Sequence, residues 1–321
     1  MHHHLKSSPE TVHWGWFDAA LPHVLTIGSG DRVTIESISG GPKNLPGEGF
    51  GVPPELLEVH AKSQQRMPGH ILTGPVGVRG AQPGDVLEVR VLEVELRQDW
   101  GYTVVRPLAG ALPDDIDAFE QIHTRLDRDK KIGTLPWGLQ IPLRPFFGVM
   151  GVAPPPKWGP ISSIEPRAHG GNMDLKHLVP GSTLYLPVFN EGAGFSVGDG
   201  HAVQGDGEVC VTAIETGLKG TFEILVRKDL DLDFPAAETP SHRITLGVDP
   251  DLDLAARAAL RRMIDCVVRE TGLSRNRAFM LMSLVADVHV TQLVNNHKGI
   301  HVMMPKTALM PLSSTPLPRA S

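Results

Sequence analysis

Glycine, aspartate, histidine and glutamate are concentrated in one short run of the chain, Gly194–Cys210. Within this run one glycine separates Asp199 from His201, and one glycine separates Asp206 from Glu208. Glycine gives the backbone access to positive φ, so carboxylates and an imidazole can turn towards a common point. A loop that only reverses the chain needs fewer glycines. We therefore expect this loop to carry a functional site.

A second glycine-rich turn, His169–Asp174, also pairs a histidine with an aspartate. Imidazole and carboxylate ligands together suit zinc, manganese or a similar divalent ion. Such an ion lowers the pKa of a bound water to about 7 and polarises a carbonyl, while a carboxylate acts as the general base. The alternative is that Asp199, His201 and Asp206 only hold their loop by accepting bonds from backbone amides. Spacing alone does not separate these two interpretations.

Other kinds of chemistry find little support in the sequence. The segment Gly198-Asp199-Gly200 lacks the third glycine of a dinucleotide-binding loop, and the chain contains no phosphate-binding Gly-Lys-Ser/Thr motif. Cys210 is expected inside an alternating strand and Cys266 inside a helix, where a cysteine is usually a small apolar residue. Ser182 and Ser196 lie in no Gly-x-Ser-x-Gly turn. A metal site or an acid–base site remains.

The composition restricts the class of protein. The net charge is −6 and no basic cluster interrupts the 321 residues, which argues against a nucleic-acid partner. No apolar run approaches the ~20 residues of a membrane span, and the first residues do not form a signal peptide. Two cysteines cannot build a disulfide framework, so we expect a cytoplasmic protein. We leave His2, His3 and His4 out of the site because they resemble the remnant of a tag.

The elements that must position these residues are mostly strands. The 34 glycines and 28 prolines favour turns and short strands. Alternating or apolar runs predict strands at 23–27, 31–36, 86–96 and 181–188, and a hairpin of 208–215 with 221–227. In the long strand, 86–96, the apolar alternation shifts near Val91-Leu92, which predicts a bulge. Residues 114–131 have the least pattern.

Helices are predicted only late in the chain, from Asp253 to about Glu270 with Gly272 at the end, and then from Ser274. Residues 288–294 return to β-like alternation. The expected fold is mainly β, with sandwich-like or barrel-like sheets and a helical pair near the C-terminus, hence α+β overall. We expect a flexible N-terminus over 1–15, one unit over 16–310 with lobes of about 16–157 and 158–310, and a loose tail over 311–321.

Five segments, in their order and spacing, resemble the acetamidase/formamidase family, and together they extend over roughly residues 20–295: His70-Ile71-Leu72-Thr73-Gly74-Pro75-Val76, Gly80-Ala81-Gln82-Pro83-Gly84-Asp85-Val86-Leu87, Gly170-Gly171-Asn172-Met173-Asp174, Gly181-Ser182-Thr183-Leu184-Tyr185-Leu186-Pro187-Val188 and Phe195 to Glu208. The resemblance implies a mainly β fold and hydrolysis of the carbon–nitrogen bond of a short linear amide to a carboxylate and ammonia. It also implies a divalent metal, zinc above calcium or manganese.

The resemblance also suggests roles for particular residues. It implies metal ligands at His169, Asp174, Asp199, His201 and His70. Glu208 would move protons and Asn172 would stabilise the oxyanion, with Asp199 and His201 as further catalytic residues. Phe195, Gly198 and Gly171 would contact the substrate. Ala193-Gly194 stands before Phe195 where the family leads us to expect Gly-Ala, a departure that bears on the choice of substrate.

Two alternatives stay open at this point. The first is a hydrolase of another carbon–nitrogen substrate on the same scaffold, such as a longer amide, a lactam or a ureido compound. The second is a β-rich module that binds a small molecule without turnover. In each case we expect a small-molecule partner, no nucleic acid and no membrane. Apolar positions on the late helical pair suggest a homo-oligomer, a dimer or higher.

Overall fold

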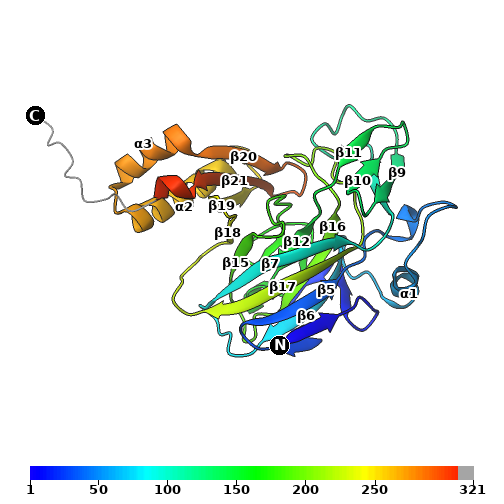
Figure 1. Ribbon diagram of the computed structural model, residues 1–321, viewed down its shortest axis with the longest axis horizontal. Coiled ribbons are helices and arrows are strands. Elements are labelled where there is room, and N and C mark those ends of the chain that lie inside the picture. Colours follow the sequence, from blue (N-terminus) through cyan, green and yellow to red (C-terminus); the bar gives the residue numbers. More distant parts are fainter. Residues whose placement is uncertain (310–321) are drawn as a thin grey trace, which may run out of the picture.

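The computed structural model describes residues 1–309, and most of its regular structure is β (Figure 1). Its strands form sheets of nine, six, four and two strands. The predicted fold class, mainly β with a helical pair near the C-terminus, is confirmed. The C-terminal helices lie beside β20 and β21 at one end of the molecule, and the small sheet that contains β9–β11 lies at the other (Figure 1).

The nine-stranded sheet joins strands from the whole length of the chain. Only its first pair, β1 with β5, is parallel. In spatial order it contains β1 (His2–Leu5), β5 (Asp31–Glu36), β17 (Leu218–Arg227), β7 (Val86–Leu96), β15 (Thr183–Pro187), β18 (Ala236–Glu238), β19 (His242–Asp249), β21 (Lys298–Pro305) and β20 (Asp287–Gln292).

The bulge predicted in the long strand is present in β7. Thr221 pairs with Glu93, but the next residue, Phe222, pairs with Val91, so Leu92 is the extra residue. Leu92 is among the exposed large apolar side chains. A bulge of this kind lets the strand change the face on which its apolar residues lie, which explains the shift in the sequence pattern.

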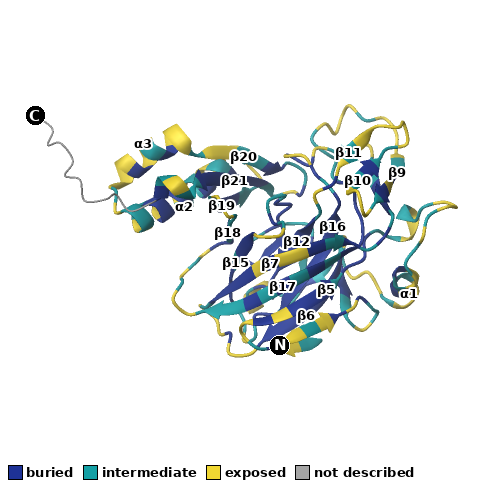
Figure 2. Cartoon of the chain, viewed as in Figure 1, coloured by how far each residue is buried: buried dark blue, intermediate teal, exposed yellow. Residues whose placement is uncertain are grey.

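The six-stranded sheet contains most of the sequence run with which we began. Its order is β14 (Gly170–Asn172), β12 (Phe146–Gly151), β16 (Phe195–His201), β6 (Ile71–Val78) and β2 (Val12–Trp14), with β4 (Leu25–Ile27) paired in parallel to β6. Every residue of β12, β16 and β6 is buried (Figure 2). The ring of Phe222 in the large sheet lies 5.6 Å from that of Phe147 and 5.8 Å from that of Phe195.

The expectation that Asp199 and His201 lie in a glycine-rich loop was wrong, since they lie in the central strand β16. Its glycines serve close packing rather than a turn. A Cβ at Gly198 would lie 2.4 Å from the carbonyl oxygen of Ile71, and one at Gly200 would lie 2.4 Å from that of Thr216. Any side chain there would push the neighbouring backbone away.

The predicted hairpin of 208–215 with 221–227 was also wrong. The second segment lies within β17, but β17 pairs with β5 and β7. The first segment is irregular, because Glu208 and Val211 have φ of 44° and 81°, outside the β region. Its polar groups bond to β8 (Trp100–Val105), with the Glu215 amide donating to the carbonyl of Tyr102 at 2.8 Å.

The four-stranded sheet consists of β8, β9 (Glu120–Asp127), β10 (Ile132–Thr134) and β11 (Gln140–Pro142). Strand β9 lies inside the stretch 114–131 that has little sequence pattern. Its apolar positions are few, because most of its side chains are exposed or half-buried and only Thr124 and Leu126 are buried. The smallest sheet pairs β3 (Trp16–Phe17) with β13 (Ile161–Ser162).

The helices are α1 (Pro54–Lys62), α2 (Leu252–Thr271) and α3 (Arg275–Val285), with short 3₁₀ turns at Pro42–Asn44, Pro156–Trp158 and Lys306–Leu309. Ser274 caps α3, as predicted, by accepting a bond from the Arg277 amide, and Asp251 rather than Asp253 caps α2. Gly272 ends α2 in the left-handed conformation, with φ of 71°. None of the helices in residues 1–309 has the length and apolar character that crossing a membrane requires.

The start of the chain is part of the large sheet. Strand β1 pairs with β5, and the side chains of His2, His3 and His4 bond to those of Thr34, Asp31 and Glu36. Strands on both sides of residue 157 pair with each other, as β7 does with β15 and β17. The division into lobes at 157 stays a prediction. The loose tail predicted over 311–321 lies outside the described residues.

Candidate functional site

A cluster of buried ionisable side chains gathers beside β16. We call Asp174, Asp199, His201, Glu208 and Glu215 the acid cluster; each has at most 6% of its surface exposed. Asp199 and His201 lie on β16, Asp174 follows β14, and the two glutamates lie in the irregular segment after β16. Since side chains two positions apart on a strand point to the same face, β16 by itself aligns its aspartate with its histidine.

His201 stands at the centre of the acid cluster. Its Nε2 atom lies 3.2 Å from Oδ2 of Asp199, 3.3 Å from Oε1 of Glu215 and 3.8 Å from Oε1 of Glu208. Two groups of potential metal ligands share this histidine, Asp199–His201–Glu215 and Asp174–His201–Glu208, and within each the ligand atoms lie within 4.8 Å of one another. The spacing is short enough for one cation to contact all three members of a group.

Two amide side chains orient the cluster. Nδ1 of His201 lies 2.8 Å from Oε1 of Gln204, whose Nε2 donates to the carbonyl of Asp174 at 3.1 Å. Asn295 donates to Oδ2 of Asp174. Nδ1–H of His201 donates to Gln204, so Nε2 faces the carboxylates. Burial acts to lower the pKa of His201, but Glu215 and Asp199 outweigh it and raise that pKa, so a metal bound here would take the place of the Nε2 proton.

Gly148, on the neighbouring strand β12, makes room for the cluster. A Cβ there would lie 2.6 Å from Oδ1 of Asp174, 2.6 Å from Oδ2 of Asp199 and 2.8 Å from Cε1 of His201. No real Cβ makes contacts this short, so any other residue would push these groups apart. The space in which the ligand atoms meet therefore depends on a residue without a side chain.

Three members of the acid cluster have left-handed backbones. The φ angles of Asp174, Asp199 and Glu208 are 53°, 56° and 44°. Such conformations cost a non-glycine residue about 1–3 kcal/mol and persist where the surroundings impose them, often at functional sites. The strain supports a functional interpretation of this cluster.

The electrostatics of the cluster are unbalanced without a cation. Burial raises the pKa of Asp174 and of Glu215 to about 7 and that of Glu208 well above its usual value. Burial also acts to raise the pKa of Asp199, but His70 and His201 outweigh it and lower that pKa. Four carboxylates thus surround one imidazole in a buried space, and a divalent cation would compensate their charge. The donor set, the unpartnered Oδ1 of Asp174 and the unpartnered Nε2 of His201 all fit such an ion.

His70 lies at the edge of the acid cluster, immediately before β6. Its Nε2 is 3.7 Å from Oδ2 of Asp199, and its Nδ1 is 3.2 Å from the hydroxyl of Ser163. Its side chain is 23% exposed, far more than that of Asp199 at 7%. His70 therefore lies where the cluster comes nearest to solvent.

His169 lies among aromatic side chains instead. Its ring contacts those of Phe17 at 4.8 Å and Trp158 at 6.3 Å, and both of its nitrogens are buried without a partner. Burial lowers its pKa to about 3, so the ring is neutral. Among residues 1–309 it belongs to none of the groups whose spacing would hold a metal. Its predicted role as a ligand stays a prediction.

The remaining predicted site residues lie on both sides of β12. Asn172 pairs with Val149, donates from Nδ2 to the carbonyl of Ile164 at 3.2 Å, and leaves its Oδ1 buried without a partner. Phe195 is fully buried in the large apolar core. Gly198 and Gly171 pair with β12 from opposite sides.

Three contributors were not identified from the sequence: Glu215, Gln204 and Asn295. Gln204 stands inside the motif that contains Asp199 and His201, so its spacing could have suggested a role. Glu215 reaches the site because its backbone bridges both His201 and Tyr102. Asn295 lies 121 positions from Asp174, and no local pattern points to it.

The chain is similar in sequence to known proteins. A model of the Acetamidase/Formamidase family matches residues 2–158 and 160–309. An acetamidase of Mycolicibacterium smegmatis is 28% identical over 214 residues, which are 47% of this chain and 52% of that protein. A formamidase of Methylophilus methylotrophus is 30% identical over 191 residues, 44% of this chain and 47% of that protein. The matches thus span about half the length of these curated relatives.

A solved structure extends the likeness over the whole fold. The crystal structure of an acetamidase from Bacillus halodurans superposes with a TM-score of 0.83 at 30% identity, over 95% of this chain and 97% of that one.

Proposed function

Since the chain belongs to the Acetamidase/Formamidase family, we propose that it hydrolyses the carbon–nitrogen bond of a short linear amide to a carboxylate and ammonia. The observation that carries this proposal is the buried acid cluster around His201. The choice of formamide or acetamide as substrate rests on what the named relatives act on. A partner of this kind is small and uncharged, so recognition would depend on the shape of the site and on a few polar groups.

We further propose that the acid cluster holds a divalent cation, zinc first, with calcium or manganese as alternatives. His201 would ligate through Nε2, with Asp199 and Glu215 or with Asp174 and Glu208 as carboxylate ligands. When bound, such an ion polarises a carbonyl and lowers the pKa of water. Gln204 would fix the tautomer of His201 through its bond to Nδ1.

Glu208 is our candidate for the proton transfers. Burial and the neighbouring Asp174 raise its pKa, so its carboxyl group holds a proton more readily than an ordinary glutamate does. As a carboxylate it would take a proton from the attacking water while the water oxygen bonds to the amide carbon. It would then give this proton to the nitrogen as the carbon–nitrogen bond breaks, which releases ammonia. Asn172 stays the candidate for the oxyanion, although its amide now donates to Ile164.

Chelation provides the first test. We expect the purified protein to release ammonia from formamide and acetamide, to lose nearly all of this activity after treatment with a chelator, and to recover it when zinc is restored. Ammonia is measured with a coupled enzyme assay, and metal content by mass spectrometry. Ammonia release that is unaffected in metal-free protein would contradict the metal-assisted mechanism while leaving the amidase assignment in place.

A substrate panel tests the alternatives. Faster turnover of a longer amide, a lactam or a ureido compound than of formamide and acetamide would favour another carbon–nitrogen hydrolase. Binding of these compounds with no turnover would favour the non-catalytic module.

Gly148 offers a test of the site's geometry. Its φ is not positive, so alanine introduces no backbone strain, and its effect should come from the new Cβ against Asp174 and Asp199. Displacing such groups by about 1 Å can cost 10²-fold in rate. We expect Gly148→Ala to lower kcat/KM for the amide by about that factor and to weaken metal binding. Gly205→Ala is the matched control, because a Cβ at Gly205 meets nothing within 4 Å; equal activity of the two variants would contradict the argument.

We also propose a homo-oligomer, supported by apolar side chains on α3. Phe279, Met280 and Leu284 are 57%, 66% and 80% exposed, and the exposed face of α3 is visible in Figure 2. Water-exposed apolar surface of this kind favours association. We expect the parent to elute as a dimer or larger in size-exclusion chromatography with light scattering, and Leu284→Glu to shift it towards the monomer. A monomeric parent would refute the proposal.

The cytoplasmic location, for which the two free cysteines are the support, likewise stays a proposal.

A further inference from the structure

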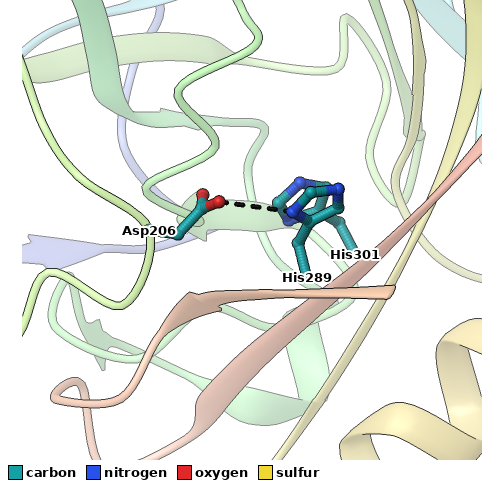
Figure 3. Close-up of side chains that lie close together, drawn as sticks. All are labelled: Asp206, His289 and His301. Carbon is teal, nitrogen blue, oxygen red and sulfur yellow. Dashed lines mark hydrogen bonds and ion pairs between the residues drawn. The ribbon is translucent and has the colours of Figure 1, made fainter. Parts of the chain in front are cut away.

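A second cluster of ligand-type side chains lies outside the acid cluster. Asp206, from the segment after β16, faces His289 on β20 and His301 on β21 (Figure 3). One ligand atom from each of these residues lies within 4.8 Å of the others. None of the three has a part in the proposed amide chemistry. We call them the histidine cluster.

The two imidazoles are held in a defined arrangement. Their rings stack with centroids 4.9 Å apart and planes 8° apart, and Nδ1 of His289 lies 3.3 Å from Oδ2 of Asp206. The paired strands set this stacking, because His289 is directly opposite His301 in the β20–β21 register. Cross-strand neighbours in such positions lie close enough for their side chains to act together.

His301 carries an unsatisfied nitrogen. The residue is fully buried, its Nδ1 lies 2.7 Å from the hydroxyl of Thr291, and its Nε2 has no hydrogen-bond partner. Leaving such an atom buried and unpaired costs about 1–3 kcal/mol. Burial and the nearby His177 and His289 lower the pKa of His301 to about 3, so its ring is neutral. In the tautomer in which Nδ1 donates to the Thr291 hydroxyl, the lone pair is on Nε2, as in histidines that bind metal ions.

Two neighbours complete the surroundings. The ring of His177 lies 5.1 Å from that of His301, and its Nε2 is also buried without a partner. Lys176 places its ammonium 2.9 Å from Oδ1 of Asp206, where it fixes the carboxylate but would repel a cation. Three imidazoles and one carboxylate form a donor set that favours zinc and similar transition-metal ions over calcium or magnesium.

We propose that Asp206, His289 and His301 form a second divalent-cation site, of the zinc type, with the His177 ring beside it. Its effect would be structural. Asp206 stands two positions before Glu208. The intervening Gly207 bonds to β20, its amide donating to the carbonyl of Thr291 at 3.1 Å. A cation here would fasten the segment that carries Glu208 to β20 and β21.

The test counts metal ions in the full-length protein. Metal-free parent, Asp206→Asn and His289→Gln are titrated with Zn²⁺ by calorimetry, and their metal content after dialysis is measured by mass spectrometry. We expect each variant to bind one Zn²⁺ fewer per chain than the parent, and to gain less thermal stability from added zinc. His242→Gln, which alters a histidine outside both clusters, should match the parent. The histidines at positions 2–4 are present in every variant, so any zinc that they bind is the same in each and does not affect the difference.

A gain-of-affinity variant guards against loss of folding. Lys176→Met leaves all the proposed ligands in place and removes the ammonium beside Asp206, so we expect Zn²⁺ to bind on the order of tenfold more tightly at this site. Equal Zn²⁺ stoichiometry in the parent, Asp206→Asn and His289→Gln would overturn the proposal. So would unchanged or weaker affinity in Lys176→Met, because removing the ammonium beside Asp206 must strengthen a cation site that includes this carboxylate.

Discussion

Replacing His201 by alanine should remove one metal ion per chain and reduce ammonia release by at least about 10³-fold. His201 is the only residue common to both ligand groups of the acid cluster within residues 1–309, so its loss leaves neither group complete. Removing a ligand from a site built around one imidazole should weaken metal binding far more than losing one of several carboxylates. The four remaining carboxylates would then be buried without the imidazole and would take up protons instead.

The informative control is His169→Ala. Both histidines are fully buried and both were candidate ligands from the sequence, but the ring of His169 lies against Phe17 and Trp158. We expect His169→Ala to lose stability through the cavity it leaves, by about 2–4 kcal/mol, and to keep its metal. Circular dichroism checks folding, and mass spectrometry counts the metal. Metal retained in His201→Ala but lost in His169→Ala would transfer the ligand role to His169.

The motifs in the sequence located the site, but they did not identify the site residues that come from other segments of the chain. Asp199 and His201 could be recognised because they are two positions apart on one segment, and a strand keeps that pair on one face. Glu215 was not found because the alternation of 208–215 assigned it to a predicted hairpin strand, whereas its position depends on a backbone bridge to His201. The histidine cluster was missed for the same reason, since His289 and His301 meet only through the register of β20 and β21.

The parts of the fold that were predicted correctly are those in which the sequence pattern and the structure have the same local cause. Ser274 and Gly272 mark helix ends because capping is local chemistry, and the bulge at Leu92 shifts the apolar parity of its own strand. The glycines of β16 misled for the opposite reason. Glycine in sequence suggests a turn, but Gly198 and Gly200 are required by contacts with Ile71 and Thr216, which are remote in the chain. Close packing between segments that are distant in the chain does not change the local hydrophobic periodicity of the sequence.

The second large effect concerns the two glutamates, whose roles the isosteric variants Glu208→Gln and Glu215→Gln should separate. Glu208 is our candidate for proton transfer, so Glu208→Gln should lower kcat by about 10²–10⁴-fold while the metal stays bound. Glu215 lies closer to His201 Nε2, at 3.3 Å against 3.8 Å, and its Oε1 accepts a bond from the Ala213 amide at 2.9 Å. This fixed position would suit a metal ligand. Glu215→Gln should therefore lose metal affinity, and its kcat should recover largely when zinc is saturating.

The comparison decides between the two carboxyls because a ligand and a proton carrier respond differently to metal concentration. Burial raises the pKa of both groups, so pKa alone does not separate them. Steady-state kinetics over a zinc series separates kcat from metal affinity, and dialysed protein gives the metal content directly. If Glu215→Gln remains inactive with its metal bound, while Glu208→Gln recovers as zinc is added, the roles are reversed. Glu215, anchored to the Ala213 amide, would then be the residue that moves the proton, and Glu208 would be the ligand that its strained backbone holds towards His201.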